Sequence, residues 1–243
     1  MASTGVRPRV NALEAALLVL AAFFGAQWLA LRVAGPEGPR AWPVWLAGSV
    51  APPLVLLAGG LVIARRFRPL VPGLRPAESA KRWIGAGACF GLTGGLLVGP
   101  TEPRDLAPLL GLWAQVAWAV VWVGLCAPLV EELFFRGVLQ PSIARWLNTP
   151  LAVVLAGLAF GVTHLGLQPL WLWPLLGVGL GCLAAGSRSL WPAVAAHAGW
   201  NLATVLGSQV HGPLSMLAGL WLMGGVVCAI TAVLAARREG PGP

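Results

Sequence analysis

The residues of this chain that could do chemistry begin with a pair of adjacent acids beside an apolar stretch. Glu131 and Glu132 directly follow the apolar run 109–130, and Arg136 comes four residues after Glu132. An ionisable side chain in a membrane helix costs about 2.5–3.5 kcal/mol near the bilayer centre, so such a group needs a compensating role. On a helix, Glu132 and Arg136 share one face, whereas Glu131 points about 100° away. Arg136 can then neutralise Glu132 and leave Glu131 free to exchange protons. A salt bridge at a helix end would explain Glu132 and Arg136 but not the second acid, Glu131.

Two of the three histidines also lie in apolar stretches. His164 ends one such stretch, and His197 lies inside another with Asn201 four residues later on the same helical face. A lone histidine in an apolar stretch is more often a packed core residue than a catalyst. Two of them, together with an acid pair, favour a polar site inside the fold. His211 precedes a Gly-Pro turn and fits a loop.

Proteolysis within a membrane is one reaction that places polar catalytic groups inside helices. The sequence lacks the serine, aspartic, zinc and cysteine arrangements that usually carry it out. No G-x-S-G element occurs for a serine nucleophile, and Asp105 is the only aspartate, whereas an aspartic protease needs two. The usual zinc motif H-E-x-x-H is absent, because His164 is followed by Leu165 and Gly166. No cysteine has an activating partner nearby in sequence. What remains is glutamate and histidine acting on water, with or without a metal.

The composition indicates which elements must position these groups. Hydrophobic residues make up 58% of the 243 residues and charged residues only 10%, with a mean hydropathy of +0.80. A typical soluble domain is about 45–50% apolar and about 25% charged, so a soluble enzyme and a disordered chain are excluded. Backbone groups in lipid must be satisfied within their own segment, which favours helices. We therefore predict an all-α, polytopic transmembrane bundle of about eight helices, from the apolar blocks 11–33, 42–64, 83–99, 108–130, 150–165, 169–186, 190–210 and 214–236.

The segment that contains the acid pair is too long for one straight membrane span. Residues 108–146 would reach about 58 Å as one helix, about twice the thickness of the hydrocarbon core. A kink near Pro128, or an interfacial segment after Arg136, is therefore expected. If the helix runs on through this segment, an antiparallel hairpin places Glu131 and His164 at matching depth.

The charges between the blocks predict the orientation. The net charge is +8, with 16 Lys and Arg against 8 Asp and Glu. Basic residues concentrate in the segments that lie on one side of an eight-span topology, which predicts that both termini are cytoplasmic. A nucleic-acid binder would instead carry its basic residues on a soluble face, so no nucleic-acid partner is expected. Tryptophans near block ends, among them Trp171 and Trp173, are expected to be interfacial anchors. The high content of Ala, Gly, Pro and Arg suggests a GC-rich genome, and from it we expect a bacterial plasma membrane.

Three ordered motifs in consecutive apolar helices resemble those of a known family. The family is the CAAX prenyl protease type 2 family, also called the CPBP intramembrane glutamic endopeptidases, which includes bacteriocin-processing and lysostaphin-resistance-like proteins. The resemblance covers about residues 120–205. The motifs are Glu131-Glu132-x-x-x-Arg136, Phe160-x-x-x-His164 and His197-x-x-x-Asn201.

The resemblance implies a catalytic role for four side chains. Glu131 and His164 would activate a water molecule that attacks a peptide carbonyl. His197 and Asn201 would stabilise the tetrahedral oxyanion, where one donor is typically worth about 2.7–4 kcal/mol. A glutamate suits the role of general base that the resemblance gives to Glu131. Hydrolysis would then need no cofactor.

The resemblance also implies that Glu132 and Arg136 orient the site. Because the family was long described as metalloproteases, a catalytic zinc is an alternative. We favour the metal-free version because it gives Asn201 a role. The ligands of a zinc ion would be Glu131, His164 and His197.

The sequence therefore predicts an integral membrane endopeptidase whose site opens toward the cytosol or the inner leaflet. Its partners would be the lipid bilayer and a peptide or protein substrate, for which a lipidated protein and a leader peptide are both options. One alternative is a proton-coupled transporter, which would depend on Glu131 titration and cleave no peptide. Another is a catalytically silent scaffold or immunity protein, which would tolerate Glu131→Gln and His164→Ala.

We divide the chain into three parts on this basis. Residues 1–107 would hold the N-terminal transmembrane helices. Residues 108–210 would form the catalytic core of the CAAX protease type. Residues 211–243 would hold the last transmembrane helix and a cytoplasmic tail.

Overall fold

The computed structural model describes residues 11–34, 42–66, 78–98, 114, 117–164 and 169–206. This part of the chain consists of helices and the turns between them, with no strand, which confirms the all-α fold class. The predicted last helix, 214–236, and His211 lie outside the described residues. In chain order the elements are α1 (Ala12–Ala34), α2 (Trp42–Arg66), α3 (Glu78–Val98), η2 (Ala119–Cys126), α5 (Ala127–Phe134), η3 (Phe135–Leu139), α6 (Gln140–Ala144), α7 (Thr149–Val162), α8 (Leu172–Ser187) and α9 (Trp191–Leu206).

The helices follow the apolar blocks closely. For example, the block 190–210 contains α9, and 150–165 nearly matches α7. By length and hydropathy, one described helix qualifies as a membrane-spanning segment, over Ala12–Ala30. The apolar helices α7 and α8, with 14 and 16 residues, are shorter than the roughly 20 residues of a full span. The count of eight spans therefore stays a prediction.

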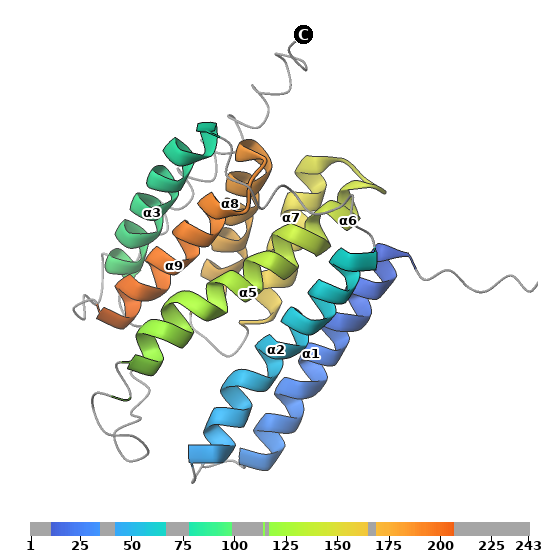
Figure 1. Cartoon of the computed structure of the whole chain (residues 1–243), viewed down its shortest axis with the longest axis vertical. Coiled ribbons are helices and arrows are strands. Elements are labelled where there is room, and N and C mark those ends of the chain that lie inside the picture. Colours follow the sequence, from blue (N-terminus) through green and yellow to red (C-terminus); the bar gives the residue numbers. More distant parts are fainter. Residues whose placement is uncertain are drawn as a thin grey trace, which may run out of the picture.

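The helix that carries the acid pair crosses the middle of the molecule. In Figure 1 it lies between the α3–α9 pair and the α1–α2 hairpin, and it contacts α9 and α2. It runs without a break through η2, α5, η3 and α6, where η2 and η3 are π-helical. The sequence predicted a kink near Pro128 or an interfacial segment after Arg136. The structure has a π-helical segment that ends at Cys126, two residues before Pro128.

A glycine seam holds α9 against α3. Gly87, Gly91 and Gly95 recur every four residues on α3, and a Cβ atom at any of them would collide with α9. At Gly95, for example, an added Cβ would lie 2.5 Å from the carbonyl oxygen of Trp200. Small residues at this spacing let two helix backbones approach closely. The seam therefore fixes the helix that carries His197 and Asn201.

A second glycine seam joins α7 to α8. A Cβ atom on Gly177 would lie 2.6 Å from the carbonyl oxygen of Gly157, and one on Gly161 would collide with Pro174. The start of α7 is fixed by Asn148, whose side chain accepts a hydrogen bond from the Leu151 N–H at 2.9 Å. The close contact of α7 with α8 positions the end of α7, where His164 follows.

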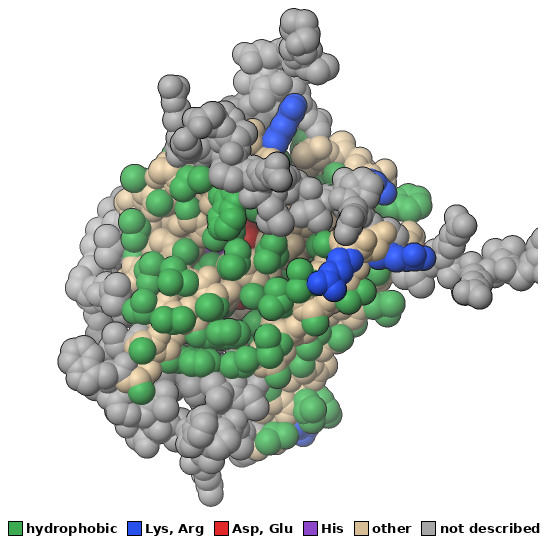
Figure 2. Space-filling model, viewed as in Figure 1, with side chains coloured by type: hydrophobic (Ala, Val, Ile, Leu, Met, Phe, Trp, Pro, Cys, Tyr) green, Lys and Arg blue, Asp and Glu red, His purple; other side chains and the backbone are tan. Residues whose placement is uncertain are grey.

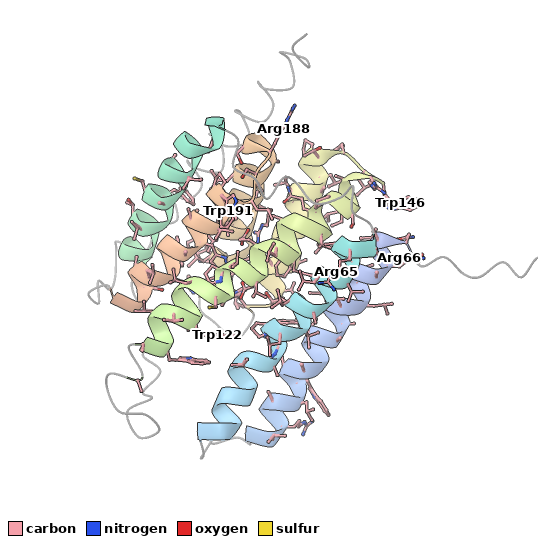
Figure 3. All side chains as sticks on the ribbon, viewed as in Figure 1. Arg65, Arg66, Trp122, Trp146, Arg188 and Trp191 are labelled. Atoms are coloured by element: carbon pink, nitrogen blue, oxygen red, sulfur yellow. The ribbon has the colours of Figure 1, made fainter. Side chains whose placement is uncertain are left out.

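The surface of the described helices is largely apolar. Leu18 and Val62 are 65% and 67% exposed, and many other large hydrophobic side chains are exposed on α1, α2 and α7. Green apolar side chains cover most of the described face in Figure 2, with arginine side chains toward its upper, right and lower edges. Figure 3 shows Arg65 and Arg66 at the end of α2 and Arg188 at the end of α8, whereas Trp122 projects from η2. Such a contiguous apolar surface suits contact with lipid.

Candidate active site

The acid pair lies on α5 between the two π-helical segments. Glu132 is fully buried, and its Oε1 accepts a hydrogen bond from Arg136 at 2.9 Å. Glu131 is 17% exposed, so the two neighbouring carboxylates have different surroundings. The structure thus contains the Glu132–Arg136 ion pair expected from the spacing, with Glu131 on another face of the helix.

Arg136 is compensated from several sides although it is almost fully buried. Besides Glu132, it donates to the carbonyl oxygen of Gly177 on α8 at 2.7 Å. Its guanidinium carbon lies 4.8 Å from the ring centroid of Phe160 and 5.7 Å from that of Phe135. Cation–π contacts of this kind stabilise a desolvated arginine. One cation therefore links the acid pair on α5 to α7 and α8.

His197 on α9 is oriented by the buried acid. Its Nδ1 lies 2.9 Å from Oε1 of Glu132, and its side chain is 3% exposed. Because an ionised carboxylate can only accept, we assign the proton to Nδ1. The other ring nitrogen, Nε2, then presents a lone pair and lies 3.9 Å from Oε2 of Glu131.

His164 is oriented by its own helix. Its Nδ1 lies 2.9 Å from the carbonyl oxygen of Phe160 and 3.1 Å from Oγ1 of Thr163. Thr163 itself donates to the same carbonyl at 2.6 Å, so both oxygens accept from Nδ1. The proton is therefore assigned to Nδ1 here too, and Nε2 lies 3.9 Å from Oε2 of Glu131.

Two aromatic rings hold the faces of His164. The Phe160 ring centroid lies 4.5 Å from that of His164, and the Trp173 ring is stacked at 5.0 Å with an interplanar angle of 18°. The sequence predicted that Trp173 is an interfacial anchor, but it is buried, with 6% exposed, while Trp171 is 47% exposed. Residues two apart on a helix point in different directions, so only one of the two faces the protein.

Three acceptor atoms face one another at the centre of this arrangement. They are Oε2 of Glu131, Nε2 of His164 and Nε2 of His197, which we call the acceptor triad. Oε2 of Glu131 is buried and has no hydrogen-bond partner in the described part of the chain. A separation of 3.9 Å is too long for a hydrogen bond. It suits one water oxygen about 2.8 Å from each atom, which could donate to the carboxylate and to one imidazole.

Asn201 contacts a different part of the structure. Its Nδ2 donates to the carbonyl oxygen of Val123 on η2 at 2.8 Å. Among the described residues, no hydrogen bond joins the Asn201 side chain to Glu131, His164 or His197. The amide therefore faces the helix backbone, although it lies one turn from His197. Nothing in the sequence alone indicated this contact.

The acceptor triad has donor chemistry that suits a zinc ion, because both Nε2 atoms present lone pairs. A tetrahedral zinc with bonds of about 2.0–2.1 Å separates its ligand atoms by about 3.4 Å. The Glu131 oxygen lies 3.9 Å from each nitrogen. Across the described ranges, no group of three His, Cys, Asp or Glu side chains meets the geometry of a metal site.

Comparison with known proteins relates the segment that carries this site to a family. Residues 113–203 match the family model described as "Type II CAAX prenyl endopeptidase Rce1-like". No curated protein and no solved structure matches the chain. The matched segment contains the acid pair, both histidines of the acceptor triad and Asn201, and it confirms the resemblance seen in the sequence motifs. Residues 113–203, less than half of the chain, therefore match a domain of the Rce1-like type II CAAX prenyl endopeptidase type, which implies a protease.

Proposed function

We propose that this protein is a glutamic endopeptidase that hydrolyses peptide bonds within or beside a membrane. The observation that carries the proposal is the acceptor triad, in which an unpartnered carboxylate oxygen of Glu131 faces two imidazole nitrogens at 3.9 Å. The family match supports a protease of the CAAX-processing type. No observation favours a transporter or a silent scaffold.

The chemical steps follow from what each atom of the triad can accept. A water molecule donates one hydrogen bond to Oε2 of Glu131 and another to Nε2 of His164. As the water oxygen forms a bond to the peptide carbonyl carbon, Glu131 takes the proton. The tetrahedral intermediate collapses when this proton passes to the amide nitrogen, and the C–N bond breaks. The products are a carboxylic acid and an amine, and Glu131 is ionised again.

His197 would act on the oxyanion of the intermediate. Its Nδ1 proton is held by Glu132, so its Nε2 can donate to an oxyanion only when the ring has first taken up a second proton from solvent, which it keeps through the step. The carboxylate of Glu132 would then face the positive imidazole ring. Preorganised donors that meet developing charge are a main source of catalytic power. The Asn201 amide carries two N–H groups, of which one is bonded to Val123 and the other would donate to the same oxyanion.

The substrate is proposed from the family and the surface. A peptide or protein that reaches the site from the bilayer fits the apolar exterior of the helices. A lipidated protein and a leader peptide both meet that condition. The proposal retains an integral location in a bacterial plasma membrane with both termini in the cytoplasm.

A cleavage assay on the full-length protein tests the proposal. Wild type, Glu131→Gln and His164→Ala would be purified in detergent and assayed on a fluorogenic peptide library, each with and without a chelator. Loss of a general base lowers kcat by about 10²–10⁴-fold, so both variants should be nearly inactive. Glu14→Gln is a matched control, because Glu14 only caps the start of α1 with Asn11.

The outcomes separate the remaining versions of the site. Equal cleavage by wild type, Glu131→Gln and His164→Ala would end the catalytic assignment. Activity that disappears with the chelator and returns with zinc would replace the metal-free mechanism by the zinc alternative, with Glu131, His164 and His197 as its ligands. Chelator-insensitive cleavage that both variants abolish is the expected result.

A further inference from the structure

The π-helical segment before the acid pair leaves one backbone carbonyl without a partner in its own helix. The Ala127 N–H donates to the carbonyl oxygen of Trp122, five residues back, as in a π-helix. It is therefore not used by Val123, whose α-helical partner it would be. The next donor in the π-helical pattern would come from residue 128, which is a proline and has no N–H. The Val123 carbonyl thus loses both of its partners.

Asn201 supplies the missing donor from another helix. Its Nδ2 lies 2.8 Å from the Val123 oxygen, a good hydrogen-bond distance. Val123 is 37% exposed, and a backbone carbonyl left unpaired on a surface that faces lipid is costly, because lipid offers no donor. An asparagine is well suited here, since its amide can donate without carrying a charge.

Among the described residues, this contact is one of two side-chain hydrogen bonds that join α9 to the helix of the acid pair. The other is the hydrogen bond of His197 to Glu132 at 2.9 Å. Asn201 lies one turn after His197, and Val123 lies about two turns before the acid pair. Two separated contacts between the same two helices fix both their rotation and their relative height. The position of Glu131 in the acceptor triad depends on both.

We propose that Asn201 has a second role, as a positioning residue: it caps the Val123 carbonyl released by Pro128, and so holds Glu131 in the acceptor triad. The proposal rests on the proposed function for its effect on catalysis, but the cap itself does not. Without the cap, the segment would tend to close into an α-helical pattern in which Ala127 donates to Val123. A shift by one residue turns the side chains that follow by about 100°, away from the histidines.

A double-mutant cycle between Asn201 and Pro128 tests the cap. Asn201→Leu removes the donor at similar volume, and Pro128→Ala restores a backbone N–H that can bond Val123. We expect Asn201→Leu to lower kcat by about 10²-fold with little change in KM, as misplacement of a catalytic group does. In the Pro128→Ala background, the same change should cost clearly less, because the carbonyl is then satisfied and only the contact to the oxyanion is lost. Asn201→Gln, which keeps the donor, should recover part of the activity.

Melting temperature provides a readout that does not need activity. Asn201→Leu should lower Tm by about 2–4 °C or more in the wild-type background and by clearly less with Pro128→Ala. Thr204→Val is the matched control on α9, because within the described residues its hydroxyl bonds only the Asn201 backbone carbonyl. If the wild type cleaves no peptide, the proposed function fails while the Tm cycle still decides on the cap.

The result that overturns the cap is an equal loss of kcat in both backgrounds with no change in Tm. That pattern is the one expected of a side chain whose sole role is to contact the oxyanion. If Pro128→Ala does not fold, Asn201→Asp decides, since aspartate keeps the shape but cannot donate when ionised. A lower Tm together with a lower kcat supports the cap, and an unchanged Tm contradicts it.

Discussion

The two histidines of the acceptor triad face the same oxygen at the same distance but are held in different ways. His164 is fixed by the carbonyl of Phe160, four residues earlier on its own helix, and by two aromatic rings. His197 is fixed by Glu132, a side chain 65 residues away that also pairs with Arg136. One anchor is therefore neutral and local, and the other is charged and formed by the tertiary fold.

This difference predicts how each histidine responds to change. A backbone carbonyl is present whenever α7 is helical, so the tautomer of His164 survives most substitutions around it. The tautomer of His197 depends on a carboxylate that must stay ionised and correctly placed. Mutations in the Glu132–Arg136 pair should therefore have large effects, and those around His164 should be graded and smaller.

The largest expected effect comes from Arg136→Met. It leaves the buried Glu132 carboxylate without its cation and the Gly177 carbonyl without a donor. Removal of one partner from a buried ion pair typically costs about 3–5 kcal/mol in the free energy of unfolding. Thermal unfolding in detergent measures it. The double variant Glu132→Leu with Arg136→Met should regain part of the loss, because no unpaired charge remains. A single variant that melts with the wild type would show that this pair does not support the fold.

The next effect is expected from Glu132→Gln, which breaks the anchor of His197 alone. A carboxamide can present an N–H to Nδ1, which places the imidazole proton on Nε2. The ring then lacks the carboxylate that would face its positive charge when it donates to the oxyanion. Loss of the correct tautomer is worth about 10²–10⁴-fold in kcat, and we expect the lower end of that range. Steady-state kinetics on a cleaved peptide gives kcat and KM, and nuclear magnetic resonance of labelled histidine reports the tautomer. Unchanged kcat with a changed tautomer would remove His197 from the mechanism.

The same contrast explains how much of the site could be predicted from the sequence. The Glu132–Arg136 pair and the contact of Phe160 with His164 both follow from a spacing of four residues, which helix geometry converts directly into proximity. The convergence of His164 and His197 on Glu131 depends on packing between helices that are distant in sequence. The ordered motifs of the family indicated that convergence, whereas the spacing within each helix did not.

Trp173 and Asn201 show why the rest could not be predicted. Position near the end of an apolar block does not tell which way a tryptophan faces, and Trp173 packs on His164 rather than at an interface. The contact of Asn201 depends on the π-helical register of η2, which Pro128 alone does not specify. The apolar blocks therefore located the described helices, while the register within them came only from the structure.

A smaller effect is expected from Trp173→Leu, which removes one aromatic face from His164. An aromatic pair is worth about 0.5–1.5 kcal/mol beyond its buried area, which corresponds to about 2–10-fold in kcat. Trp173→Phe should retain most of the activity, because a stacking face remains. Trp171→Leu is the matched control, since Trp171 is exposed beside it. Equal losses for Trp171→Leu and Trp173→Leu would indicate a general effect on the start of α8.

The smallest effect is expected from Thr163→Val. The hydroxyl lies 3.1 Å from Nδ1 of His164, but the Phe160 carbonyl lies closer, at 2.9 Å, and remains after the substitution. Because the local anchor is redundant, kcat should fall by less than about 3-fold, within the energy of one ordinary hydrogen bond. Thr163→Ser, which keeps the hydroxyl, is the control. A loss larger than that of Trp173→Leu would mean that His164 depends on a side chain for its tautomer, as His197 does, and the contrast between the two anchors would disappear.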